Sequence, residues 1–169
     1  MLQEHAKIVQ FVSIANGVTG RKKLQKMIYI AKKMRFPFFE KYELHMYGPY
    51  SEELTLRVEE LCEMGFLNEN KEDKGSYVQY SYRTTDEGST FIETLCEEND
   101  HLTKCIDLLN KKSARFLELV STLLYFDHLP NTERIEKVKA VKGKLNFTEE
   151  EMEEAFAFIE QLKACTVAS

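Results

Sequence analysis

The stretch from His45 to Leu67, HMYGPYSEELTLRVEELCEMGFL, is the feature that most constrains how this chain can fold. Its Gly48-Pro49 pair is expected to turn the chain, and Ser51 is a good N-cap for the helix that follows. Apolar residues recur at helical spacing in that helix, and Gly65 suits a left-handed cap after it. The segments FLNEN and YVQYSYRTT then predict two strands joined as a hairpin.

Two helices are predicted ahead of this stretch. Apolar residues recur at helical spacing over residues 8–15, and Asn16-Gly17 is expected to end the first helix. Thr19 is expected to cap a second, basic helix over residues 20–35. The spacing of its apolar residues predicts one buried face, with three lysines on the opposite side: Lys22, Lys26 and Lys33.

The rest of the chain is predicted to be helical. Residues 86–111 carry an apolar stripe with a weak point at residues 98–100, so they form either one long helix or two. The stripe at residues 91–109 fits packing against a second copy of the chain, and it fits an intrachain bundle equally well. Further helical segments follow, and the last opens with a capping box made by Thr148 and Glu151.

Composition and charge narrow the class of protein. The chain has 169 residues, of which 43% are hydrophobic and 30% charged, so it is long enough to bury a core without disulfides or metals. Its formal net charge is −5, whereas a general nucleic-acid-binding protein is basic. The sequence shows no signal peptide and no apolar segment long enough to span a membrane, so we expect a cytoplasmic protein.

No motif points to catalysis, a metal or a cofactor. The four cysteines lack the paired spacing of zinc and redox sites, so we expect reduced, structural thiols. The four histidines stand apart from one another and show no metal-ligand spacing. The sequence also has no phosphate-binding loop and no dinucleotide motif. We therefore expect a protein that is not an enzyme and that carries no cofactor.

Charge is segregated between two neighbouring helices. Residues 17–39 contain seven lysines or arginines and no acidic residue. Residues 51–64 contain five glutamates and one arginine, a balance of 1 − 5 = −4. If the second helix entered a DNA groove, its carboxylates would face phosphates, and the repulsion would offset much of what the lysines contribute.

The segment from Leu24 to Gly88 resembles the winged helix-turn-helix superfamily, of the kind seen in MarR- and PadR-like regulators. The resemblance rests on LRVEELCEMGFL, on the two strands, and on RTTDEG, whose Thr-x-x-Gly pattern closes the wing in those families. We therefore predict a fold that is mainly α with a small β-hairpin wing. Residues 1–90 are predicted to form a winged helix-turn-helix core, and residues 91–169 a helical extension packed on it as one folding unit.

A narrower resemblance lies at the front of the chain. GRKKLQKMIYIAKKM followed by HMYGPYSEEL is similar to the Panacea, or SocA-like, domain, with its Lys-Leu-x-Lys-hydrophobic-x-Tyr helix and its Tyr-Gly-Pro turn. Over its full length the chain resembles the YwgA-like proteins of bacilli. Panacea domains similar to this one act as antitoxins that bind toxin proteins, so the resemblance implies a protein partner. It carries over no catalytic residue.

Two functions remain open. The first is a non-enzymatic regulatory adaptor that binds a protein partner or a second copy of itself, with Tyr47 and Tyr50 either anchoring the partner or filling the core. The second is a DNA-binding regulator that uses the basic helix 20–35 and the wing 71–76, which the acidic helix 51–64 disfavours. The candidate interaction residues are Tyr47, Gly48, Pro49, Tyr50, Glu52, Glu53, Lys22, Lys26 and Lys33.

Overall fold

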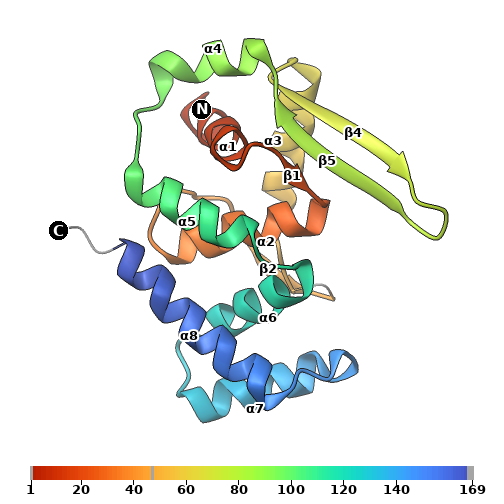
Figure 1. Ribbon diagram of the computed structural model, residues 1–169, viewed down its shortest axis with the longest axis vertical. Coiled ribbons are helices and arrows are strands. Elements are labelled where there is room, and N and C mark those ends of the chain that lie inside the picture. Colours follow the sequence, from red (N-terminus) through yellow and green to blue (C-terminus); the bar gives the residue numbers. More distant parts are fainter. Residues whose placement is uncertain (1, 47, 167–169) are drawn as a thin grey trace.

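The computed structural model describes residues 2–46 and 48–166. The protein is mainly helical with a small antiparallel sheet (Figure 1). Its helices are α1 (Leu2–Ala15), α2 (Arg21–Lys33), α3 (Glu52–Glu63), α4 (Asp86–Leu95), α5 (Asp100–Asn110), α6 (Ala114–Tyr125), α7 (Asn131–Val141) and α8 (Glu149–Thr166), with a short 3-10 helix, η1 (Gly143–Leu145). Its strands are β1 (Val18–Thr19), β2 (Glu43–His45), β3 (Gly48–Tyr50), β4 (Leu67–Asp73) and β5 (Val78–Thr84).

The larger sheet has three antiparallel strands in the order β1-β5-β4. β4 and β5 pair from Leu67 opposite Thr84 to Asp73 opposite Val78, which confirms the predicted hairpin. This hairpin projects from one side of the molecule (Figure 1). The sequence does not predict β1, because two residues are too few to show an alternating pattern. Thr19 therefore pairs in the sheet and does not cap α2 as expected.

α2 is the central helix of the fold. Eight consecutive residues, from Leu24 to Ala31, are buried, so the helix is covered all round. α6, α5 and β3 pack against it. The predicted basic outer face is therefore wrong for Lys26, whose residue is only 2% exposed. Hydrophobic periodicity marks the most apolar side of a helix, but it does not show whether a distant segment covers the other side.

α3 has the ends and the buried face that its sequence predicts. Ser51 Oγ accepts a hydrogen bond from Leu54 N at 3.1 Å, as a helix N-cap does. Gly65 follows the helix with a φ of +79°, in the left-handed region. Leu54, Val58 and Leu61 are buried, and the helix packs against α1 and β4. The glutamate-rich side of α3 is thereby left toward solvent.

Residues 86–111 form two helices, α4 and α5, so the second of the two open alternatives holds. α4 ends at Leu95, and the next residue, Cys96, is extended, with a φ of −126° and a ψ of 140°. Asn99 caps α5 by accepting a hydrogen bond from Leu102 N at 3.1 Å. Three apolar residues of α5 lie in the core of this same chain: Leu102, Ile106 and Leu109. The stripe at 91–109 is thus divided between two helices, and its α5 residues pack inside this chain. Self-association through the stripe stays a prediction, but these α5 residues are not exposed to a second copy.

The C-terminal helices pack on the same core. α6 contacts α2, α7 and α8, and α8 also contacts α5. The capping box of α8 is confirmed, because Thr148 N donates to Glu151 Oε1 and Glu151 N donates to Thr148 Oγ1, both at 3.0 Å. The division into a core at 1–90 and an extension at 91–169 stays a prediction. Among the described residues, no helix has both the length and the apolar character that crossing a membrane requires.

Candidate functional site

The β2–β3 hairpin carries the Gly-Pro-Tyr part of the aromatic turn. Gly48 and Pro49 lie within β3, so the chain reverses before them and not at the Gly-Pro pair itself. Gly48 has a φ of +95°, and a Cβ there would lie 3.5 Å from Glu118 Cγ and 3.7 Å from Lys26 Cε. The hairpin therefore lies against the joint between α2 and α6. Tyr47 is outside the described residues, so both of its expected roles, anchoring a partner or filling the core, stay predictions.

Tyr50 lies between the hairpin and α3. Its ring stacks on His45 with 5.0 Å between the ring centroids, and its hydroxyl is 2.8 Å from Thr55 Oγ1. Gln25 of α2 joins the same region, because its side-chain amide donates to Ser51 O and accepts from Ser51 N, both at 2.9 Å. Gln25 is not among the residues that the sequence predicts for this region, and its one signal is an amide between Leu24 and Lys26, just before the apolar residues 27–31 of α2.

A buried ion pair lies beneath the hairpin. Lys26 Nζ is 3.9 Å from Glu118 Oε1, and the two side chains are 3% and 10% exposed. Burial lowers the pKa of Lys26 to about 8, although the charge of Glu118 acts in the opposite direction. Lys142, at the end of α7, donates to the carbonyls of His45 and Met46 at the hairpin tip. Lys26 is thus an internal charge beneath the hairpin, and it is not available to a partner.

Other basic residues of α2 are also engaged within the chain. Lys33 Nζ is 2.8 Å from Asp127 Oδ2, and Lys23 Nζ donates to Asn110 O at 2.8 Å. Lys22 is exposed at the start of the helix. Of the three lysines predicted to form one basic face, one is exposed, one is buried and one is paired. The basic charge of this helix is therefore largely compensated inside the fold.

The solvent face of α3 is acidic with apolar residues among the charges. Arg57, the single basic residue of the helix, turns inward and pairs with Glu4 and Glu40. Glu53 also lies near Arg57, at 3.6 Å, so it is engaged while Glu52 is exposed. Leu56 is 59% exposed and Met64, just after the helix, is 43% exposed. We define the α3 face by its exposed residues: Glu52, Leu56, Glu59, Glu60, Glu63 and Met64.

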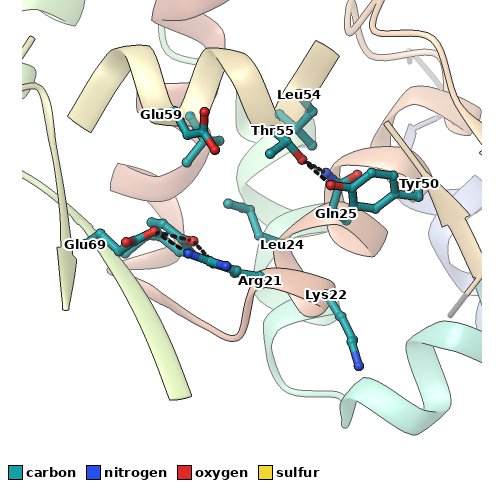
Figure 2. A pocket seen from close by; sticks show the side chains of 11 residues that line it. Arg21, Lys22, Leu24, Gln25, Tyr50, Leu54, Thr55, Glu59 and Glu69 are labelled. Atoms are coloured by element: carbon teal, nitrogen blue, oxygen red, sulfur yellow. Dashed lines mark hydrogen bonds and ion pairs between the residues drawn. The ribbon is translucent and has the colours of Figure 1, made fainter. Parts of the chain in front are cut away.

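A cavity of about 130 Å³ lies between α2, α3 and the β4–β5 hairpin (Figure 2). On one wall, Arg21 Nε donates to the Tyr82 hydroxyl at 3.3 Å, and that hydroxyl donates to Glu69 Oε2 at 2.8 Å. Figure 2 shows this group on one side of Leu24 and the Tyr50–Thr55–Gln25 group on the other. The charges along the first wall are already paired, so the cavity is an apolar recess between two polar groups.

The tip of the β4–β5 hairpin offers no excess of positive charge. Residues 71–76 hold two lysines and two carboxylates, a balance of 2 − 2 = 0, and Lys74 Nζ is 2.7 Å from Glu72 Oε2. Tyr77 and Val78 at the start of β5 are 58% and 42% exposed. The hairpin therefore presents apolar side chains and balanced charges, and its tip is not a basic surface for phosphates.

Neither the acidic nor the sulfur-bearing side chains form a metal site in the described residues. Among residues 2–46 and 48–166, no group of three histidine, cysteine, aspartate or glutamate side chains could hold a metal ion. All four cysteines are free thiols. Burial raises the pKa of Cys105 to about 12, so this thiol stays protonated and unreactive.

Comparison with known proteins gives one relative of nearly the same length. No protein family model matches the chain. A protein of Bacillus subtilis (strain 168) named "Uncharacterized protein YwgA" is 56% identical over 163 residues, which span 96% of this chain and 98% of the relative. The match therefore includes the small sheet, the α3 face and the C-terminal helices alike.

Proposed function

We propose that this chain, which belongs to the YwgA family, is a non-enzymatic regulatory adaptor that binds a basic surface of a partner protein through its α3 face. The composition of that face carries the proposal: four glutamates surround the exposed side chains of Leu56 and Met64, and no basic residue is among them. Exposed apolar residues within a charged rim are typical of protein-binding surfaces. Negative charge at the rim selects a positively charged partner.

The order of elements supports a winged-helix description of the front of the chain. α1, β1, α2, α3, β4 and β5 follow one another, and β5 lies between β1 and β4 in the sheet. In such an arrangement α3 has the position of a recognition helix, and β4–β5 has the position of the wing. The β2–β3 hairpin, where the Panacea-like Tyr-Gly-Pro pattern falls, is inserted just before α3. By this resemblance the partner is a protein that the adaptor holds inactive, as an antitoxin does.

A DNA-binding role is the second candidate, and the distribution of charge argues against it. Lys26 and Lys33 are engaged within the fold, and the tip of the β4–β5 hairpin has no net charge. The helix in the reading position exposes four glutamates. Affinity for DNA depends on cations that displace counterions from phosphates, and this surface supplies few of them.

Photocrosslinking in the native host tests the adaptor proposal. A photoreactive amino acid at Leu56 is expected to capture one defined protein with a basic surface, because Leu56 lies at the centre of the α3 face. The same group at Ala157, an exposed position of α8, is the control and is expected to capture nothing comparable. Equal capture of the same protein from both positions would contradict the proposal.

Charge reversal on the same face gives the matched comparison. Glu52→Lys with Glu63→Lys is expected to reduce capture at Leu56 by roughly tenfold or more, since two attractive charges become repulsive. Glu153→Lys with Glu154→Lys on α8 makes the same change of net charge elsewhere and is expected to leave capture unchanged. If both pairs reduce capture equally, net charge and not the α3 face controls the interaction.

Fluorescence anisotropy with random duplex DNA tests the second candidate. At about 150 mM salt the protein is expected to bind more weakly than roughly 10 μM, within the range of non-specific contacts. Lys22→Glu with Lys71→Glu changes two exposed cations and leaves the buried Lys26 in place, so the variant should fold normally. Sub-micromolar binding that this variant abolishes would reverse the choice between the two functions.

A further inference from the structure

A groove on another part of the molecule is not used by the proposed function. It has a volume of about 660 Å³ and runs between α1, α4 and the start of α5. Three half-buried apolar side chains lie along it: Ile14, Ile92 and Cys96. Its polar walls include Gln10 of α1, whose side-chain amide donates to Glu97 O at 2.8 Å and so joins α1 to the segment between α4 and α5. The groove therefore exists because residues 86–111 form two helices that are separated at residues 96–99.

The rim of this groove carries charge of one sign. Four carboxylates line it and no lysine or arginine does: Glu93, Glu97, Glu98 and Asp100. Within the described residues, none of these four side chains forms an ion pair or a hydrogen bond, and they do not converge as metal ligands would. Unpaired like charges that line one groove repel one another, and a cationic occupant would relieve that repulsion.

The helix ends and the cation near the groove leave its electrostatic potential negative. α4 ends at this groove and α1 passes its last turn beside it, so carbonyl-rich helix C-termini add to the negative potential. The positive N-terminus of α5 is already capped by Asn99 and faces the charge of Asp100. Burial raises the pKa of the Cys96 thiol, and the charge of Lys7 partly offsets that rise. The Lys7 ammonium, however, lies over the Phe39 ring, 5.3 Å from the ring centroid.

We propose that this groove binds a lysine- or arginine-rich segment of a protein in which aliphatic residues alternate with the basic ones. The aliphatic side chains would contact Ile14 and Ile92, and the cations would face the four carboxylates. Such a segment matches both the apolar floor and the charge of the rim, whereas a polyamine would satisfy only the rim and an apolar segment only the floor. The groove does not share a residue with the α3 face, so this proposal is independent of the proposed function.

Isothermal calorimetry on the full chain at about 50 mM salt tests the proposal with three synthetic hexapeptide amides. The first probe is Lys-Leu-Lys-Lys-Leu-Lys, the second replaces both leucines with serine, and the third replaces all lysines with glutamate. Binding is expected for the first probe, with affinity roughly tenfold lower for the second because it leaves the floor uncovered. No binding is expected for the third, since its charges repel the rim.

Two triple variants locate the site. Glu93→Gln with Glu97→Gln and Glu98→Gln is expected to weaken the first probe by roughly tenfold, through the loss of several exposed ion pairs. Glu153→Gln with Glu154→Gln and Glu160→Gln removes the same charge from α8, which neither proposal uses, and is expected to change the affinity of the first probe less than twofold. All six glutamates are exposed, so both variants should keep the fold.

Three results would overturn the groove proposal. They are equal weakening by both triple variants, equal affinity for the leucine and serine probes, and binding of the glutamate probe. Weakening by the α8 variant alone would also reject the groove, while leaving the adaptor proposal intact. Conversely, if the photoreactive group at Leu56 captures no protein while the first probe still binds at the groove, the adaptor proposal alone is rejected.

Discussion

Replacing Glu118 with leucine is expected to lower the free energy of unfolding by about 2 kcal/mol at neutral pH. The substitution leaves the Lys26 ammonium, whose side chain is 3% exposed, without its partner carboxylate. Breaking a buried pair costs more than breaking a surface pair, because the remaining charge stays out of water. The pKa of Lys26 is already lowered to about 8, so the unpaired lysine can lose its proton near neutral pH, which limits the loss. Urea denaturation measures the effect.

The double variant Lys26→Met with Glu118→Leu is expected to recover the whole loss and to be as stable as the wild type or up to about 4 kcal/mol more stable. Removing both charges also removes the cost of burying them. Lys33→Met is the control on the same helix, since its partly exposed pair with Asp127 should contribute under about 1 kcal/mol. If the double variant lost as much stability as the two single variants added together, the pair would not be an isolated buried charge pair.

The same lysine gives a pH dependence. In the folded chain the pKa of Lys26 is lowered to about 8 from its ordinary value of 10.5. The unfolded chain therefore binds more protons than the folded chain between these two values, and this contribution to stability rises with pH there, by up to about 3 kcal/mol. Buried tyrosines and thiols with raised pKa values, such as Tyr29 and Cys105, act in the opposite direction at high pH.

The difference in stability between the wild type and Lys26→Met isolates this contribution, because the tyrosines and thiols are common to both. That difference is expected to grow from pH 8 to pH 10.5. Denaturation curves collected across this range measure it. A difference that stays constant, or that shrinks as pH rises, would mean that Lys26 does not lose its proton early in the folded state.

Gly88→Ala is the second large effect, with an expected loss of about 3 kcal/mol or more. A Cβ at Gly88 would overlap the carbonyl oxygen of Phe66 and would lie 2.9 Å from Thr84 Cγ2. That carbonyl is fixed, because it accepts a hydrogen bond from Thr85 N at 3.1 Å. Alanine is the better helix former by about 1 kcal/mol, which is too little to offset the overlap. The close approach gives a physical reason for glycine in the Thr-x-x-Gly pattern.

Gly143→Ala is the matched control, since a Cβ there would have no heavy atom within 4 Å. This variant is expected to change stability by under about 1 kcal/mol. Thermal melts of the two alanine variants compare them directly. Equal, small changes in both would show that α4 can move away from Phe66 and Thr84 at little cost, and that the close approach of Gly88 to Phe66 does not constrain the fold.

The elements that the sequence predicts correctly are those whose cause is local. Ser51 caps α3, Gly65 ends it, Thr148 and Glu151 form a capping box, and β4 pairs with β5 as a hairpin. In each case the interacting groups lie within a few residues or in adjacent strands, so residue type and spacing suffice to predict them. The acidic side of α3 is predictable for the same reason, because periodicity places its glutamates opposite the apolar stripe.

The parts that the sequence does not predict depend on segments far apart in the chain. Lys26 lies on the side of α2 that its own helix pattern leaves open, and α6 and the β2–β3 hairpin cover that side. Gln25 looks like an ordinary amide until Ser51 lies beside it. The acidic groove exists only because α4 and α5 separate and then pack beside α1.

The sequence by itself thus determined most of the helices, the caps of α3 and α8, the hairpin and the acidity of α3, because these follow from backbone geometry and from neighbours along the chain. Only the tertiary structure decided which charges are available to a partner. A lysine on an isolated helix is solvated, but in the folded protein its exposure depends on whatever packs over it. Here that packing buries Lys26, pairs Lys33 with Asp127, and leaves the glutamates of α3 in solvent.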